Sequence, residues 1–139
     1  VKEFQKIMNL NVNAAYNFIQ ESVKLMEANG NKGKIITIGS IASHWTERGG
    51  SGAYTASKHA VYAMVESVAR QLHGSESNIA VSMLCPGVVD TPLTNPNKNS
   101  QPHWLKPETI AASALHIATA PVNANIFDIT VFGMKDKPW

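Results

Sequence analysis

The chain is poor in cysteine, with Cys85 as the single cysteine among 139 residues. One thiol excludes a disulfide within the chain and a cysteine-rich zinc site, so the composition favours a reducing compartment such as the cytoplasm. The five histidines show no ligand spacing, and the sequence therefore predicts no metal site. Cys85 ends an apolar run, and we interpret it as a small buried residue and not as a nucleophile.

Net charge and long apolar runs are also scarce. The net charge is +2 with the basic residues scattered, which argues against a nucleic-acid partner. No apolar run approaches the roughly 18–20 residues of a membrane-spanning helix, and no signal-peptide pattern opens the sequence, so we expect no membrane partner. The 44% hydrophobic content predicts one folded domain over residues 1–139.

Helical and strand patterns alternate along the chain. Apolar periodicity and continuous apolar runs predict helices over residues 1–28, 54–73 and 105–120, and buried strands over residues 34–38, 79–85 and 126–132. Such alternation implies right-handed crossovers, so we predict an α/β fold with a parallel sheet and flanking helices. The polar stretch from Thr91 to His103 is expected to be a mobile loop and part of a substrate pocket.

Tyr54 and Lys58 are four residues apart in the second predicted helix, so they share one helix face. A cation beside a phenol favours the phenolate, which brings proton transfer closer to neutral pH. Ligands bind beyond the carboxyl ends of parallel strands, so Ser40, after the first strand, and Pro86-Gly87, after the second, are expected at the same edge. Such a set of residues suits the interconversion of a carbonyl and an alcohol.

Four sequence signatures resemble the short-chain dehydrogenase/reductase family. They are Asn11-Val12, Gly39-Ser40, Tyr54-Thr55-Ala56-Ser57-Lys58 and Pro86-Gly87-Val88-Val89-Asp90-Thr91. The resemblance covers essentially the whole chain, with the signatures in order and at compatible spacings. It implies a Rossmann-like fold and an oxidoreductase that moves a hydride between NAD or NADP and a small-molecule carbonyl or alcohol.

The resemblance also implies roles for individual residues. Tyr54 would be the catalytic acid/base, and Ser40 would orient the substrate oxygen. Lys58 would tune Tyr54 and hydrogen-bond the nicotinamide ribose, while Asn11 would hold a relay water near that lysine. The residues that match the turn along the nicotinamide and its carboxamide are Pro86, Gly87, Val89 and Thr91.

Two of these roles have competitors in the sequence. Ser40 precedes Tyr54 by fourteen positions, slightly more than is usual in the family, so Ser43 is an alternative to Ser40. Asn9 and Asn13 flank Asn11, and all three could simply form a polar helix face.

A strand, a Gly-rich turn and a helix that would bind a pyrophosphate are missing from the 139 residues. Gly49-Gly50-Ser51-Gly52 is rich in glycine but follows the wrong segment. We therefore expect a truncated fold, the carboxyl-terminal catalytic half without its amino-terminal βαβ dinucleotide-binding half. Weak cofactor binding and a bare edge on the strand at 34–38 should follow, because the phosphate contacts and a neighbouring strand are missing.

Three functions are compatible with these observations. The first is part of an NAD(P)-dependent oxidoreductase. The second is a truncated, non-catalytic pseudo-enzyme that acts as a binding module, and a homo-oligomer through the two long helices is expected in either case. The third, a Ser-His-Asp hydrolase, is disfavoured because Gly39-Ser40-Ile41-Ala42-Ser43 lacks the second glycine of a nucleophile elbow.

Overall fold

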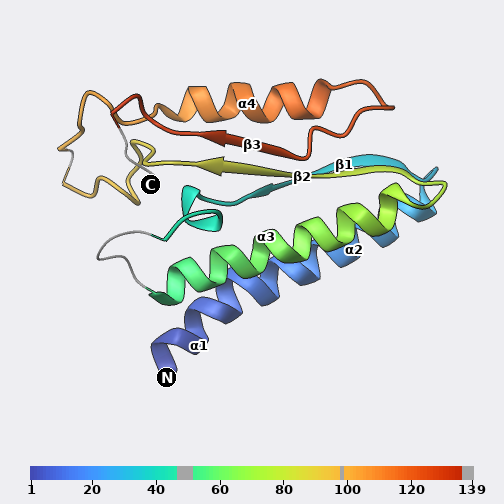
Figure 1. Ribbon diagram of the computed structural model, residues 1–139, viewed down its shortest axis with the longest axis horizontal. Coiled ribbons are helices and arrows are strands. Elements are labelled where there is room, and N and C mark those ends of the chain that lie inside the picture. Colours follow the sequence, from blue (N-terminus) through green and yellow to red (C-terminus); the bar gives the residue numbers. More distant parts are fainter. Residues whose placement is uncertain (47–51, 98, 136–139) are drawn as a thin grey trace.

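A parallel three-stranded sheet with the strand order β1-β2-β3 forms the centre of the fold. The computed structural model describes residues 1–46, 52–97 and 99–135. The strands are β1 (Lys32–Ile38), β2 (Asn78–Pro86) and β3 (Asp128–Val131). Helices α2 (Ala14–Ala28) and α3 (Gly52–His73) cover one face, and α4 (Pro107–Thr119) covers the other (Figure 1). This confirms the predicted α/β fold with a parallel sheet.

The first predicted helix is wrong in one respect, because it is not a continuous α-helix. It consists of α1 (Lys2–Met8), a π-helical turn η1 (Asn9–Asn13) and α2. A π-helical turn accommodates one extra residue, and in this turn the Asn11 side chain bonds Ser57 on α3. The helix ends at Ala28, as predicted.

Element boundaries differ from the prediction by a few residues. Strand β1 begins at Lys32, two residues earlier than expected, and β3 is shorter at both ends than residues 126–132. Helix α3 begins at Gly52 and not at Tyr54, and the glycines at 49–50 of the glycine-rich run lie outside the described residues. Gly30 has a φ of +97°, a conformation that favours glycine and ends the helical path before β1.

The prediction that the first strand is buried on both faces is wrong. Within β1 only Ile35 is buried, and Ile38 is 50% exposed. In the described part of the chain β1 pairs with β2 alone, so its other edge has no neighbouring strand. By contrast β2 is buried from Val81 to Cys85 because it has a strand on each side.

The hydrophobic core lies between the sheet and the helix pair α2 and α3. Its buried members are Ile19, Ile35, Val61, Val65, Ala69, Leu72, Ile79, Val81, Met83 and Cys85. Four of them recur at spacings of three or four on α3, and the last four alternate along β2. Cys85 is therefore on the α3 side of the sheet, and it is buried as predicted.

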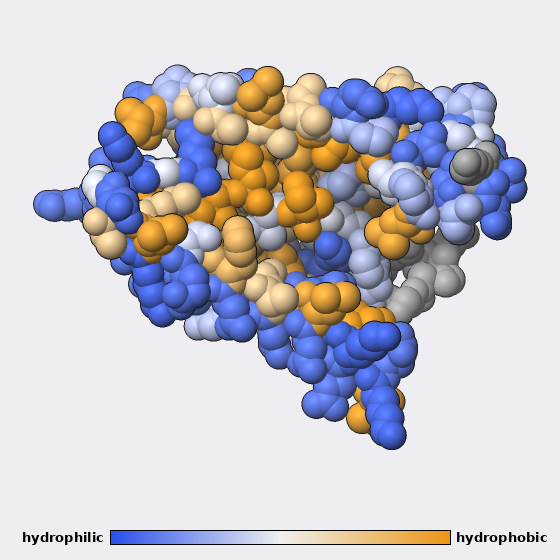
Figure 2. Space-filling model, turned by 180° about the vertical axis from the view of Figure 1, so that it is seen from behind, coloured by the Kyte–Doolittle hydropathy of each residue, from blue (hydrophilic) through white to orange (hydrophobic). Residues whose placement is uncertain are grey.

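Apolar side chains gather on the surface seen from behind in Figure 2, around a hollow between the upper and lower parts of the molecule. Large apolar side chains that are more than 60% exposed include Leu10, Phe18 and Leu25 on the first helical stretch and Leu115 on α4. None of the helices described is long and apolar enough to cross a membrane.

Candidate active site

The carboxyl end of the sheet collects the residues that the sequence singled out. Strand β1 leads into a short 3-10 turn, η2 (Ile41–Ser43), strand β2 ends at Pro86, and α3 begins beside them (Figure 1). Ser40, Tyr54 and the turn after β2 therefore approach one edge, which the parallel arrangement predicted.

Lys58 is anchored to the end of β1. Its Nζ atom donates a 3.2 Å hydrogen bond to the carbonyl oxygen of Ile38 and lies 5.7 Å from the centroid of the Tyr54 ring. Burial lowers the pKa of Lys58, and the nearby Cys85 thiol group opposes this shift. The charged end of Lys58 is thus fixed by Ile38 at a position near the Tyr54 ring.

Asn11 is linked to the same turn of α3. Its Nδ2 atom donates to Ser57 Oγ over 3.0 Å, and Ser57 Oγ donates to the Tyr54 carbonyl oxygen over 2.7 Å. The exposed Asn9 and Asn13 bond each other, with 2.8 Å between Oδ1 and Nδ2. Asn11 is thus the asparagine of this group whose side-chain hydrogen bond reaches α3. Ser57, fully buried, is a residue to which the sequence assigned no separate role.

Ser40 and Ser43 cap the turn η2 reciprocally. Ser40 Oγ accepts a hydrogen bond from the Ala42 amide over 3.1 Å, and Ser43 Oγ accepts one from the Ser40 amide over 3.3 Å. A methyl group on Gly39 would lie 3.0 Å from Ser43 Oγ and 2.8 Å from Cys85 Sγ. The Ser43 hydroxyl therefore lies next to Gly39 and Cys85, on the buried side of the turn.

The turn after β2 is held to the neighbouring strand and loop. The Gly87 amide donates to the Val131 carbonyl over 2.7 Å, and Val89 forms a parallel bridge with Leu105. Thr91 is bonded to Thr94 through its amide and its hydroxyl, each over 3.2 Å. The residues that match the nicotinamide turn, Pro86, Gly87, Val89 and Thr91, thus form a continuous, hydrogen-bonded segment.

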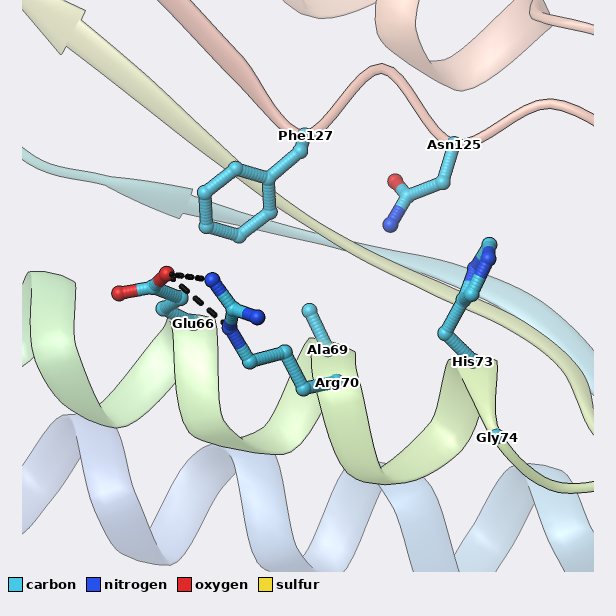
Figure 3. Close-up of a pocket in the computed structure, with 7 residues that line it drawn as sticks. All are labelled: Glu66, Ala69, Arg70, His73, Gly74, Asn125 and Phe127. Atoms are coloured by element: carbon cyan, nitrogen blue, oxygen red, sulfur yellow. Dashed lines mark hydrogen bonds and ion pairs between the residues drawn. The ribbon is translucent and has the colours of Figure 1, made fainter.

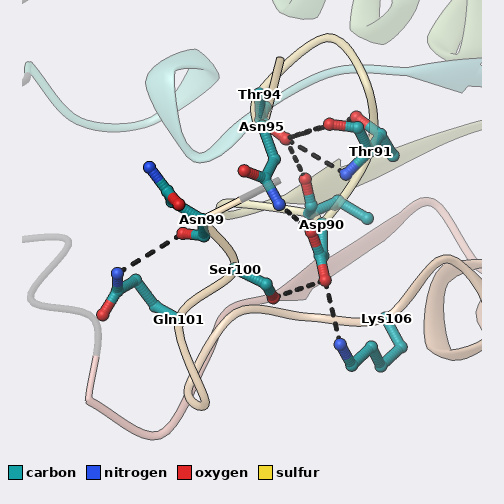
Figure 4. Close-up of polar contacts among 9 residues, drawn as sticks. Asp90, Thr91, Thr94, Asn95, Asn99, Ser100, Gln101 and Lys106 are labelled. Carbon is teal, nitrogen blue, oxygen red and sulfur yellow. Dashed lines mark hydrogen bonds and ion pairs between the residues drawn. The ribbon is translucent and has the colours of Figure 1, made fainter. Parts of the chain in front are cut away.

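Asp90 organises the loop that follows, which the sequence did not indicate (Figure 4). Its carboxylate accepts hydrogen bonds from Asn95 Nδ2 over 2.8 Å, from Ser100 Oγ and from Lys106 Nζ over 2.9 Å. These donors, Ser100 first, lower the pKa of Asp90 to about 2. The carboxylate therefore connects both ends of the stretch from Thr91 to Lys106.

A separate groove lies toward the other end of α3 (Figure 3). It has a volume of about 490 Å³ and is lined by Glu66, Ala69, Arg70, His73, Gly74, Asn125 and Phe127. Arg70 is committed to Glu66, with 2.6 Å between Nη2 and Oε1. The groove shares no residue with the edge that holds Tyr54 and Lys58.

Comparison with known proteins decides the family. The short chain dehydrogenase family matches residues 1–102, which is most of the chain. The chain belongs to this family. The resemblance inferred from the four signatures is thus confirmed.

Two curated members of the family are similar over two thirds of the chain. The 3-oxoacyl-(acyl-carrier-protein) reductase MabA of Mycobacterium tuberculosis is 34% identical over 93 residues, which are 67% of this chain and 36% of that protein. The 3alpha-hydroxysteroid dehydrogenase of Mediterraneibacter gnavus is 40% identical over 92 residues, 66% of this chain and 35% of that protein. The chain matches only about a third of the length of these relatives.

Among solved structures, the closed form of serine dehydrogenase complexed with NADP+ has the same fold. The TM-score is 0.84 at 22% identity, and the match covers 99% of this chain and 58% of that one. This likeness supports the Rossmann-like character of the sheet and its helices.

Proposed function

We propose that this chain supplies the acid/base and nicotinamide-contacting part of an NAD(P)-dependent oxidoreductase that interconverts a small-molecule carbonyl and an alcohol. The observation that carries the proposal is the position of Lys58, fixed to Ile38 at the end of β1 with its ammonium group beside the Tyr54 ring. The two relatives named above are a reductase and a dehydrogenase, which supports the same reaction class.

The residues of the chain would handle the proton. In the reducing direction the Tyr54 hydroxyl would give its proton to the carbonyl oxygen, and Lys58 would stabilise the negative charge left on the phenol oxygen. Ser40 would donate a hydrogen bond to the same substrate oxygen. Asn11 would support a water near Lys58 through which the proton is replaced. A bound nicotinamide would supply the hydride, or accept it in the oxidising direction.

Ser40 is preferred to Ser43 for the substrate contact. Both hydroxyls accept backbone hydrogen bonds within η2, which leaves each with its own proton to donate. Ser43 is the more buried of the two, 3% exposed against 8%, and it lies beside Cys85. Ser40 is thus the better placed of the two to meet a ligand from the open edge.

NAD or NADP fits the residues present at its nicotinamide end. The Lys58 ammonium has three N–H donors, and the hydrogen bond to the Ile38 carbonyl uses one of them. The remaining N–H donors of Lys58 would bond the ribose hydroxyls. The turn formed by Pro86, Gly87, Val89 and Thr91 would lie along the nicotinamide ring. The similar serine dehydrogenase was solved with NADP+, which supports a cofactor of this class.

We also propose that residues 1–139 form one domain, the catalytic half of the fold, and bind the cofactor weakly by themselves. The sequence has no Gly-rich turn in the position and with the spacing that bind a pyrophosphate, because Gly49-Gly50-Ser51-Gly52 follows the wrong segment. Titration of the chain with NADH and NADPH, followed by nicotinamide fluorescence, tests this. Dissociation constants in the micromolar range would contradict weak binding, while NAD(P)H oxidation at 340 nm with any aldehyde or ketone would contradict the alternative of a non-catalytic pseudo-enzyme.

A homo-oligomer in a cytoplasmic setting is the assembly that we propose. Phe18 and Leu25 on α2 are 69% and 66% exposed, and the adjoining Leu10 is 69% exposed. Apolar surface of this kind on one long helix commonly marks an interface between proteins. A monomer in light scattering at high protein concentration would contradict this assembly.

A further inference from the structure

We propose that His44, Cys85 and Asp128 form a binding site for a divalent cation that accepts thiolate, such as Zn²⁺. The three residues come from different segments: the end of η2, the end of β2 and the start of β3. Their ligand atoms all lie within 4.8 Å of one another. Imidazole nitrogen, thiolate sulfur and carboxylate oxygen are each kinds of ligand that zinc uses in proteins.

The spacing of the ligand atoms is close to what one cation requires. In a tetrahedral site with the usual zinc–ligand bond lengths, two ligand atoms are about 3.3–3.6 Å apart. His44 Nε2 and Asp128 Oδ2 are 3.1 Å apart. The largest separation in the set is no more than 4.8 Å, so closure around a cation needs a displacement of roughly 1 Å, within the reach of side-chain rotation.

His44 has a binding capacity that the protein does not use. Its Nε2 atom is buried and has no hydrogen-bond partner among the described residues, although Asp128 Oδ2 is only 3.1 Å away, because the two groups do not have hydrogen-bond geometry. A buried nitrogen without a partner is costly. A cation bound by both groups would be coordinated by a lone pair of His44 Nε2 and by one of Asp128 Oδ2.

Neighbouring groups already orient the ligands. Thr130 Oγ1 donates to Asp128 Oδ1 over 3.1 Å, and Asp128 Oδ2 is the oxygen that lies 3.1 Å from His44 Nε2. The His44 ring packs edge-on against Tyr62, with 4.7 Å between the ring centroids, and is flanked by Trp45 at 5.2 Å. Outer contacts of this kind fix ring and carboxylate orientations in metal sites.

The charges of the two anionic ligands balance those of a dication. Coordination replaces the Cys85 thiol proton, which goes to solvent, by the metal, so the thiolate and the Asp128 carboxylate neutralise the two positive charges. Lys58 is the cation that interacts with Cys85, and it opposes a second positive charge there. A bound cation would tie the turn that carries Ser40 to the ends of two strands.

Cobalt spectroscopy tests the site without any cofactor or substrate. Because Cys85 is the single cysteine, a thiolate-to-cobalt charge-transfer band in the near ultraviolet can arise from no other residue. We expect this band to saturate at one equivalent of Co²⁺ and to disappear when Zn²⁺ is added. The cysteine variant Cys85→Ser should lose it, and His44→Gln and Asp128→Asn, which remove direct ligands, should weaken Co²⁺ binding by more than the roughly 10–100-fold typical of outer-shell changes.

His116→Gln is the matched control, because this histidine is exposed on α4, and it should leave the band unchanged. Circular dichroism shows whether each variant is folded. If a variant does not fold, the cobalt spectrum of the unmodified chain still tests whether the site binds a cation. Absence of a cobalt–thiolate band in that chain, or a Co²⁺ affinity unchanged in a folded His44→Gln variant, would overturn the site and would leave the proposed oxidoreductase function untouched.

Discussion

Asn11 Nδ2 lies 3.0 Å from Ser57 Oγ, and this bond joins the π-helical turn of the first helical stretch to the turn of α3 that carries Lys58. The two residues are 46 positions apart in sequence. Since Ser57 also bonds the Tyr54 carbonyl, the distortion of one helix is connected to the first turns of the other.

Replacement of Asn11 by alanine should destabilise the chain by about 1 kcal/mol, because the partly buried hydrogen bond to Ser57 is lost. Urea unfolding measures this. Asn13→Ala is the control, since the Asn13 side chain is exposed and bonds Asn9 on the same helical stretch. Equal destabilisation by both substitutions would show that the Asn11–Ser57 hydrogen bond adds nothing of its own to the free energy of unfolding.

Tyr54→Phe should reduce turnover by about 10²–10⁴-fold while leaving NAD(P)H binding nearly unchanged, because the ring remains and only the proton donor is removed. The measurement is NAD(P)H oxidation, followed at 340 nm with a carbonyl substrate that the unmodified protein reduces. Tyr16→Phe, on the exposed face of α2, is the control and should retain activity. Full turnover in Tyr54→Phe would exclude Tyr54 as the acid/base.

Lys58→Met should change the dependence of stability on pH. The pKa of Lys58 in the folded chain is below its ordinary value of 10.5, so between these two values the unfolded chain binds more protons. The stability that Lys58 contributes therefore rises with pH up to about 10.5. Urea unfolding from pH 7 to pH 10 should show the wild-type chain gaining stability relative to Lys58→Met.

Lys24→Met is the control for this pH series, because Glu21 raises the pKa of Lys24 and the sign is reversed. The relative stability of the wild-type chain should not rise with pH in that comparison. A pH trend for Lys58→Met that is flat, or that matches the one for Lys24→Met, would contradict burial as the dominant effect on Lys58.

Asp90→Asn should loosen the loop that begins at Thr91, because the carboxylate that accepts from Asn95, Ser100 and Lys106 is replaced by an amide. Limited proteolysis should cut this loop several-fold faster than in the wild-type chain. Glu108→Gln, an exposed acid in the first turn of α4, should leave the cleavage rate unchanged.

The same substitution has a signature in acid. The pKa of Asp90 is about 2, below its ordinary value of 3.8, so its stabilising effect is complete above pH 4 and is lost as the pH falls through 2. The Asp90→Asn variant should therefore lose less stability than the wild-type chain as the pH falls from 4 through 2. Identical acid transitions in both chains would argue that the network does not stabilise the fold.

Gly39→Ala should destabilise the chain by about 1–3 kcal/mol, because the added methyl group would overlap its neighbours. It would lie 2.6 Å from Met83 Cε and 2.8 Å from Cys85 Sγ. Gly52→Ala is the control, since none of the described residues lies within 4 Å of its added methyl group, and it should be neutral or slightly stabilising at the start of α3. Thermal unfolding of the two variants separates these outcomes.

Features that depend on local sequence could be predicted. The pairing of Tyr54 with Lys58 follows from helix periodicity, and the parallel sheet follows from the alternation of helices and strands. The end of the first helical stretch at Ala28 follows from Asn29-Gly30. Each of these signals is contained within a few neighbouring residues.

Features that depend on tertiary contacts could not be predicted in the same way. The turn at Asn9–Asn13 is π-helical, and Asn11 finds its partner on α3, which no local pattern indicates. His44, Cys85 and Asp128 lie more than forty positions apart in sequence, so a search for ligand spacing finds no site. The exposure of β1 depends on the strands present beside it, and its apolar composition alone indicated full burial.

The π-helical turn also fixes the rotational phase of the chain before it. One residue inserted into an α-helix rotates everything on its amino-terminal side by about 100° around the helix axis. Deletion of Leu10, which is 69% exposed, would convert the stretch into a regular α-helix and turn the face of α1 that carries Phe4 and Ile7 away from its present direction. The presence of the single residue Leu10 therefore decides in which direction the Phe4 and Ile7 face of α1 points.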